Sequence, residues 1–139
     1  MRYVLAIHYD ESDLPPEGSP EADELWAAYN RFTQELADAG AFEAADALQP
    51  VAMACTLTDA GDETIVTDGP FAETKEHLGG FYLIQCSDMA AAVEWGRRCP
   101  GVTHGSVEVR PVLEMGLARD PEFLAGVAAR RETTCSTSS

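Results

Sequence analysis

Residues 67–84 read Thr-Asp-Gly-Pro-Phe-Ala-Glu-Thr-Lys-Glu-His-Leu-Gly-Gly-Phe-Tyr-Leu-Ile. The pair Gly69 and Pro70 predicts a turn, because glycine tolerates positive φ angles and proline presets the backbone. A charged run follows, and the apolar residues 81–86 behind the glycine pair predict a strand. This stretch therefore places a turn, a charged cluster and two glycines directly before a strand.

The residues upstream predict a strand followed by a helix. Residues 2–9 show the alternation of a strand, and both faces of that strand are largely apolar. One face carries Tyr3, Leu5, Ile7 and Tyr9, and the other carries Val4, Ala6 and His8. Ser19 before Pro20 is a favourable helix start, because serine accepts an orphan amide hydrogen and proline has none to lose. We expect this helix to end at Gly40, which suits a left-handed cap.

The rest of the chain predicts a hairpin, a second helix, a last strand and a short third helix. These elements are a hairpin over residues 51–58 and 64–67, a helix capped by Asp88 and ended by Pro100, a strand over residues 106–113 and a short helix from Asp120. The order strand, helix, hairpin, strand, helix, strand is typical of an α+β fold. In such a fold the helices cover one face of a mainly antiparallel sheet.

The charge of the chain restricts its partners. The length of 139 residues is enough for one domain whose core folds without disulfides or metals. Twenty-four acidic residues against nine basic residues give a formal net charge of -15. Such a charge repels nucleic-acid phosphates and anionic membrane surfaces. We therefore expect neither a nucleic acid nor a membrane as a partner.

The cysteines and the absence of a targeting pattern bear on the compartment. The sequence shows no charged and then apolar leader, and no apolar run long enough to cross a membrane. Cys55, Cys86, Cys99 and Cys135 are widely spaced and form no C-x-x-C pair. This spacing suits a reducing compartment better than a disulfide framework. We expect a cytoplasmic protein.

The chain resembles the YCII-related proteins, and within them the group called DGPF after the tetrapeptide at positions 68–71. The usual form of that motif is close to V-T-D-G-P-F-A-E-T-K-E-x-L-G-G-F/Y-Y-L-I, and here only His77 falls at its freely varying position. Residues 3–11, 28–40 and 105–112 also agree with the family pattern.

The resemblance divides the chain into three parts. Residues 1–116 are expected to form the YCII-related DGPF domain. Residues 117–131 are expected to form a helical extension, and the polar residues 132–139 a disordered tail.

The resemblance also implies a ferredoxin-like, dimeric α+β barrel. In such folds the sheets of two subunits pack against each other. The apolar residues on both faces of the strand over residues 2–9 support this, because a second apolar face needs a partner. We therefore expect a homodimer.

Two charged residues of the motif are candidates for chemistry. Asp68 could act as a general base or acid at the rim of a pocket, or it could only hydrogen-bond the amides of the turn that follows. Lys75 is the only lysine in the chain. It could hold a carboxylate or phenolate of a ligand, or it could pair with Glu73 or Glu76 on a solvated loop.

Other residues could complete a binding site. Glu73 and Thr74 could form a polar wall next to Lys75, and the glycine pair at positions 79 and 80 could admit a ligand or a neighbouring strand. His8 could line the same pocket, although a core histidine is the alternative.

Tyr29 is a candidate because of what the resemblance implies. The shorter YCII proteins carry a histidine in the first helix that has been proposed to act with an aspartate. Counting back from the glycine that ends the helix, the matching position here holds Tyr29. The tyrosine could donate a proton or hold a ligand oxygen, or it could pack in the core beside Phe32 and Leu36.

The sequence predicts no metal site and no cofactor. His8, His77 and His104 do not have the spacing of metal ligands. The chain also lacks a nucleophile elbow, a phosphate-binding loop and a dinucleotide fingerprint.

Two classes of function follow. The first is a cofactor-independent acid–base enzyme, of lyase or isomerase type, acting on a small aromatic or carbonyl-bearing molecule, since related α+β barrel proteins include isomerases, monooxygenases and a dehydrochlorinase. Asp68 would then move a proton, Lys75 would hold an oxyanion, and aromatic walls would come from Tyr3, Tyr9, Phe81 and Tyr82. The second is a non-catalytic dimeric ligand-binding or regulatory module, because DGPF proteins resemble companions encoded near extracytoplasmic-function sigma factors.

Overall fold

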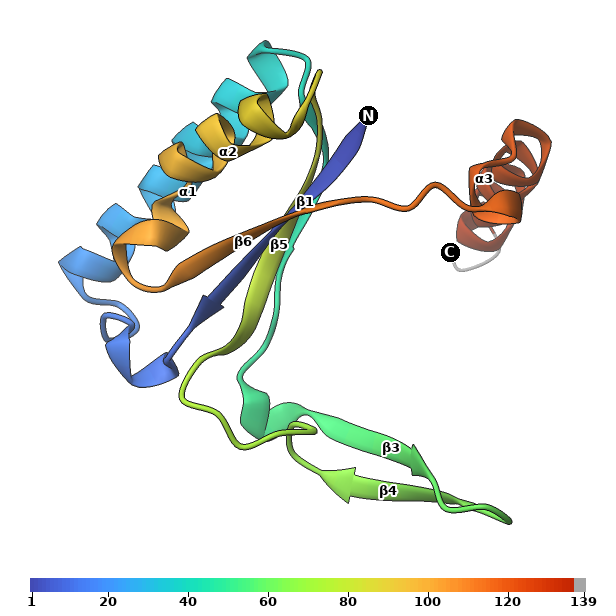
Figure 1. Ribbon diagram of the computed structural model, residues 1–139, viewed down its shortest axis with the longest axis horizontal. Coiled ribbons are helices and arrows are strands. Elements are labelled where there is room, and N and C mark those ends of the chain that lie inside the picture. The colour runs from blue at the N-terminus through green and yellow to red at the C-terminus, as the bar shows by residue number, and fades with distance from the viewer. Residues whose placement is uncertain (137–139) are drawn as a thin grey trace.

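The computed structural model describes residues 1–136 and shows an α+β fold with two antiparallel sheets (Figure 1). The strands are β1 (Arg2–Tyr9), β2 (Phe42–Ala47), β3 (Cys55–Asp59), β4 (Thr64–Asp68), β5 (His77–Gln85) and β6 (Ser106–Pro111). The helices are α1 (Pro20–Asp38), α2 (Met89–Arg98) and α3 (Pro121–Ser136). Short 3-10 turns are η1 (Glu11–Asp13), η2 (Val51–Met53), η3 (Pro100–Thr103) and η4 (Gly116–Arg119). The expected fold class is confirmed.

The main sheet has four strands in the order β2-β5-β1-β6, and every neighbouring pair is antiparallel. With the β3–β4 hairpin set aside, this is the strand order of a ferredoxin-like fold, in which each of two helices connects an edge strand to a central one. The expected caps are present, because the Ser19 side chain accepts from the backbone nitrogen of Ala22 and the Asp88 side chain accepts from that of Ala91.

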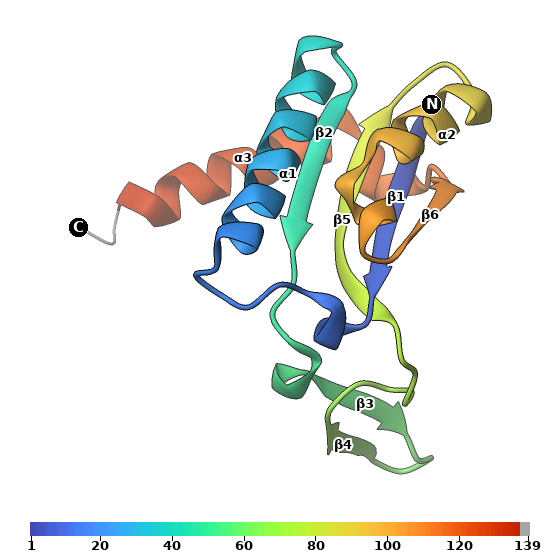
Figure 2. The same cartoon turned by 90° about the vertical axis from the view of Figure 1, so that its left-hand side faces the viewer.

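Both connecting helices lie on the same side of the sheet (Figures 1 and 2). Figure 2 shows α1 near β2 and β5, and α2 near β1 and β6. The core forms between these helices and the odd-numbered positions of β1. Its largest fully buried side chains are Leu5, Leu36, Ile84 and Cys99.

The opposite side of the main sheet carries the even-numbered positions of β1. We call it the open face and define it by Val4, Ala6, Phe81 and Leu83, because Val4 pairs with Leu83 and Ala6 pairs with Phe81. Figure 1 shows that α3 stands away from this side of the sheet, whereas α1 and α2 cover the other.

The β3–β4 hairpin forms a separate two-stranded sheet that projects from the end of the main sheet (Figure 1). Its apolar side chains are largely exposed, among them Leu57 at 63% and Val66 at 63%. The expected hairpin is present, but residues 51–53 form η2 and not the start of its first strand.

The structure corrects two further expectations. Residues 42–47 form β2, a strand that the sequence pattern did not reveal, and this strand rather than the hairpin pairs with β5. Helix α3 extends to residue 136, so the tail expected from residue 132 is helical over its first five residues. Residues 137–139 lie outside the described part of the chain.

An ion-pair network ties the segment after β6 to the main sheet. The guanidinium of Arg2 donates to both carboxylate oxygens of Glu114, from Nε at 2.9 Å and from Nη2 at 2.8 Å, and it also donates to Glu43 on β2 at 3.3 Å. Hydrogen bonding to Arg2 lowers the pKa of Glu114. Arg119 reaches the same carboxylate at 3.1 Å. The C-terminal extension therefore begins from a fixed position.

Candidate functional site

A cavity of about 660 Å³ lies between α1 and the edge of the main sheet. One wall comes from α1 through Leu25, Trp26 and Tyr29, and the facing wall comes from β2 and from Gly79 to Tyr82 of β5. The loops over residues 11–17 and 48–50 form its mouth. Its size and its mixture of apolar walls with a few polar groups are typical of a small-molecule site.

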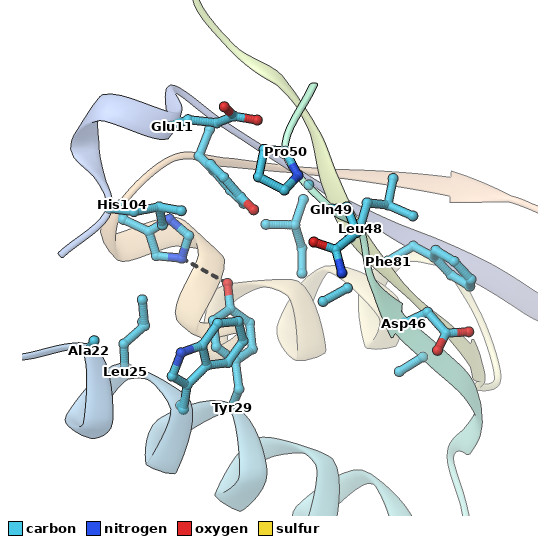
Figure 3. Close-up of a pocket in the computed structure, with 18 of the residues that line it drawn as sticks. Glu11, Ala22, Leu25, Tyr29, Asp46, Leu48, Gln49, Pro50, Phe81 and His104 are labelled. Atoms are coloured by element: carbon cyan, nitrogen blue, oxygen red, sulfur yellow. Dashed lines mark hydrogen bonds between the residues drawn. The ribbon is translucent and has the colours of Figure 1, made fainter. Parts of the chain in front are cut away.

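Tyr29 and His104 meet at this cavity. The Tyr29 hydroxyl oxygen lies 2.8 Å from Nε2 of His104 (Figure 3). Tyr29 comes from the middle of α1, and His104 follows η3 directly before β6, so the two residues are 75 positions apart in the chain. The fold therefore builds this pair from two distant segments.

Burial keeps both members of the pair uncharged. It raises the pKa of the Tyr29 hydroxyl and lowers the pKa of the His104 imidazole. The Nδ1 atom of His104 is buried and has no hydrogen-bond partner among residues 1–136. A neutral imidazole with Nδ1 protonated would accept the Tyr29 hydroxyl hydrogen at Nε2. Moving the Tyr29 proton to His104 would charge both groups against these shifts, so without a ligand the pair is a hydrogen bond between two neutral groups.

Further aromatic and hydroxyl groups surround the pair. The Tyr9 ring meets the His104 ring edge-on, with centroids 5.2 Å apart. Thr33 joins two elements, because its Oγ1 lies 2.8 Å from the Tyr82 hydroxyl and donates to the Tyr29 carbonyl oxygen at 2.8 Å. Burial raises the pKa of both Tyr9 and Tyr82. The expected aromatic walls are present at Tyr9 and Tyr82.

Two other residues expected to supply aromatic walls are placed differently. Tyr3 is buried in the core and does not line the cavity. Phe81 borders the cavity, but its ring points away from Tyr29 (Figure 3).

Glycine at position 79 has a clear reason in this site. A Cβ placed there would lie 2.1–2.4 Å from Cε1, Cζ and the hydroxyl oxygen of Tyr9. Gly80 has a different neighbour, since a Cβ there would lie 2.9 Å from the carbonyl oxygen of Asp46 on β2. The glycine pair therefore admits a tyrosine ring and a neighbouring strand.

The structure places Asp68 away from the cavity. It is the last residue of β4, its side chain is exposed, and it is absent from the described cavity lining. The turn behind it is held by Gly69, whose nitrogen donates to the Ala54 carbonyl oxygen at 2.7 Å. The catalytic role of Asp68 stays a prediction that the position of the cavity does not support.

The other charged residues of the motif form an exposed loop outside the cavity. Thr74 Oγ1 donates to the Glu76 carbonyl oxygen at 2.6 Å, and the Glu76 carboxylate accepts from Ser106 at 3.2 Å. Lys75 is exposed. Hydrogen bonds from Ser12 are the main cause of the lowered pKa of Asp10, and the positive charge of Lys75 contributes to this lowering. Glu73 is exposed on the same loop.

His8 and Tyr29 lie on opposite sides of the main sheet. His8 is an even-numbered position of β1 and pairs with Ser106, so it belongs to the side of the open face. Of the residues that the sequence analysis selected for the site, Tyr29 lines the cavity, whereas His8, Asp68, Glu73, Thr74 and Lys75 do not. Their binding roles stay predictions.

His104 was not among the site residues expected from the sequence, where it entered only as a member of a histidine metal site. One signal was available in the sequence. If the strand over residues 2–9 pairs antiparallel with the strand over residues 106–113, residue 104 lies next to Tyr9.

Within the described part of the chain, no group of three or more His, Cys, Asp or Glu side chains is arranged to hold a metal ion. Among residues 1–136, no helix has the length and apolar character that crossing a membrane requires.

Comparison with known proteins gives the family. The sequence profile of the YCII-related domain matches residues 1–116. The chain is also 36% identical over 114 residues to the Uncharacterized protein R00369 of Rhizobium meliloti (strain 1021), and the match covers 81% of this chain and 92% of that protein. With the ferredoxin-like strand order described above, these matches show that the chain belongs to the YCII-related family.

Proposed function

We propose that the protein binds a small aromatic or carbonyl-bearing molecule between α1 and β5, and acts on it as an acid–base enzyme without a cofactor. The observation that carries this proposal is the 2.8 Å contact between Tyr29 and His104 in the wall of a cavity of about 660 Å³. Proton-transfer catalysis requires an acid or base group within hydrogen-bond reach of the bound ligand, and both members of this pair line the cavity.

The state of the pair suggests the direction of transfer. Because burial lowers its pKa, His104 is neutral near pH 7 and can accept a proton. A ligand would pass its proton to the Tyr29 oxygen while the Tyr29 proton moves to Nε2 of His104. The ligand then loses one proton and the imidazole gains one. The reverse movement returns a proton to the ligand, so the pair can complete an isomerisation.

The test is the exchange of carbon-bound hydrogens of an uncharged ketone with an aromatic ring, phenylacetone, in D₂O, followed by proton NMR. We expect the wild type to accelerate exchange next to the carbonyl group. Tyr29→Phe and His104→Asn should each slow exchange roughly 100- to 10,000-fold, as expected for a lost acid–base group. Tyr3→Phe is the matched control, because this buried tyrosine does not line the cavity.

Asp68→Asn separates this proposal from the sequence-based assignment. Exchange should stay within about twofold of the wild type. Asp68 is exposed on β4, and a general base acts only when it lies within hydrogen-bond distance of the ligand. Loss of exchange in Asp68→Asn, with exchange retained in Tyr29→Phe, would support Asp68 as the catalytic residue and would contradict the proposal.

A second candidate function is a ligand-binding or regulatory module of the DGPF group that performs no turnover. Two observations favour it: most of the motif residues 68–75 are exposed, and so are the apolar side chains of the β3–β4 hairpin. Exposed apolar surface of this kind is typical of contact with another protein. An association with extracytoplasmic-function sigma factors and a cytoplasmic location belong to this candidate. Binding of phenylacetone without any acceleration of exchange would support it.

We also propose that the protein is a homodimer in which two open faces pack together. The centre of this face is apolar, through Val4, Ala6 and Leu83, and charged residues such as Glu108 and Arg110 lie on β6 at its edge. Sheets that are apolar on both faces require a second layer on each. A second copy supplies that layer with the same curvature and the same residues.

A further inference from the structure

The ionisable side chains at the mouth of the cavity are acidic. Among the described residues that line it, Glu11, Glu17 and Asp46 carry carboxylates and none is a lysine or an arginine. Two of these carboxylates are directed away from the Tyr29 hydroxyl. Glu11 accepts from the backbone nitrogen of Val51 at 2.8 Å, and the Asp46 carboxylate points away from Tyr29 (Figure 3). The cavity therefore offers no fixed cation to an anionic ligand.

Apart from these carboxylates, the polar side chains that line the cavity are uncharged. Its hydrogen-bonding groups are the hydroxyls of Tyr9, Tyr29, Thr33 and Tyr82, the imidazole of His104 and the amides of Asn30 and Gln49. Burial keeps the three tyrosines protonated, because it raises their pKa, and it keeps His104 neutral. These groups can donate to or accept from a ligand oxygen, but in these protonation states none carries a positive charge that could pair with an anionic ligand.

Among the described residues, every lysine and arginine lies outside the cavity lining. Arg98 pairs with Glu35 on the outer side of α1 and lies over the Trp95 ring at 4.4 Å. Lys75 lies on the motif loop, and its charge contributes to the lowered pKa of Asp10 just after β1. A carboxylate or phenolate in the cavity would thus lose water without gaining a counter-charge, in a protein with a net charge of -15.

We propose that the cavity takes an uncharged ring-bearing molecule with a carbonyl or hydroxyl oxygen, and that it discriminates against the carboxylate of the same skeleton. The ring would lie against Trp26, which is 55% exposed at the cavity and whose centroid is 5.9 Å from that of Tyr29. The oxygen would face the Tyr29 hydroxyl. This inference rests on the proposed function only in taking the cavity as the binding site.

The test is calorimetric titration of the full chain with three probes that share one ring system, namely indole-3-acetamide, indole-3-acetate and tryptamine. We expect the uncharged amide to bind about tenfold more tightly than either the acetate or the protonated amine. Acetate binding as tight as amide binding would overturn the inference, as would tightest binding of tryptamine. Failure of all three probes to bind would show that the cavity does not accept such rings.

A positive charge introduced into the cavity should abolish the preference for the amide over the acetate. Asn30 and Gln34 both lie on α1 and are exposed, but only Asn30 lines the cavity. Asn30→Lys should raise the affinity for indole-3-acetate about tenfold, and the matched control Gln34→Lys should leave it within about twofold. Equal gains in both variants would show that the overall charge, and not the cavity, sets the preference.

Two further variants separate this inference from the proton-transfer proposal. Trp26→Ala should weaken the binding of the amide, since it removes the ring at the mouth, whereas Trp26→Phe should restore most of it. Tyr29→Phe should keep the preference for amide over acetate, because it removes no charge. If that variant keeps the preference and also keeps its exchange activity, only the proton-transfer proposal fails.

Discussion

The ring of Tyr9 lies directly on the backbone of Gly79, at a distance that leaves no room for a Cβ atom. This contact fixes the Tyr9 side chain between β5 and the His104 ring. A residue without a side chain in β5 thereby positions an aromatic wall of the cavity.

Gly79→Ala should therefore displace the Tyr9 ring. We expect a loss of about 1–3 kcal/mol in the free energy of unfolding, typical of an overpacked contact, together with weaker binding of indole-3-acetamide. Urea denaturation measures the first effect. In a Tyr9→Ala background the same glycine substitution should cost much less, because the clashing ring is absent, and equal costs in both backgrounds would contradict this account.

His104 should make stability depend on pH in a defined window. Burial lowers its pKa in the folded protein below its ordinary value of about 6.5. As pH falls from about 6.5 towards the folded value, the unfolded chain binds the proton first, so wild-type stability should decrease. Above about 6.5 this contribution is constant, because His104 is neutral in both states.

The measurement is urea denaturation of wild type and His104→Asn between pH 5 and pH 8. The variant should show a flatter decline below about pH 6.5, whatever its absolute stability. Its neighbours Tyr9 and Tyr29 stay protonated throughout this range, since burial raises the pKa of each hydroxyl. Parallel curves for the two proteins would show that His104 is not a buried neutral group.

Packing of two open faces predicts a dimer that a single charge disrupts. Leu83→Glu places a carboxylate at the centre of the open face beside Val4. We expect sedimentation equilibrium to give a dimer for the wild type and a monomer for this variant, since an unpaired carboxylate is costly in an apolar interface. Ala37→Glu, at an exposed position of α1, is the control and should stay dimeric. A monomeric wild type at micromolar concentration would contradict the proposal.

The cysteines should differ in reactivity. Cys99 is 0% exposed, and burial raises the pKa of its thiol to about 11, whereas Cys55 is exposed on β3. Iodoacetamide at about pH 8 should therefore modify Cys55 and leave Cys99 intact in the native protein, because only the thiolate reacts. Mass spectrometry reads out both sites. Modification of both at equal rates would show that the core around Cys99 opens readily.

The fold was largely readable from the sequence, because its strongest signals are local. The alternation in β1, the serine and proline that start α1 and the aspartate that caps α2 each act within a few residues. Strand β2 was missed because residues 42–47 contain alanine, aspartate and glutamate, which have low β propensity. Pairing with β5, a tertiary interaction, holds this segment extended.

The candidate site was only partly readable. The motif residues are adjacent in sequence, which suggested a common pocket, but the turn at Gly69 leads the chain onto a loop beyond the end of the main sheet. Tyr29 was selected through the resemblance to the YCII-related proteins, because it matches their helix histidine when counted back from the glycine that ends the helix. His104 could be matched to it only through the pairing of β6 with β1, which brings together residues 75 positions apart.

The connection between β2 and β5 leaves the main sheet and returns to it at neighbouring strands. The backbone nitrogen of Leu48, just after β2, donates to the carbonyl oxygen of Gly79 in β5 at 2.8 Å. The first and last residues of the connecting segment therefore meet at the cavity wall. A short loop joining these ends would preserve the register of both strands, because loop closure depends only weakly on length. The β3–β4 hairpin is therefore an arm inserted between two adjacent strands, and its removal should leave the register of β2 and β5 unchanged.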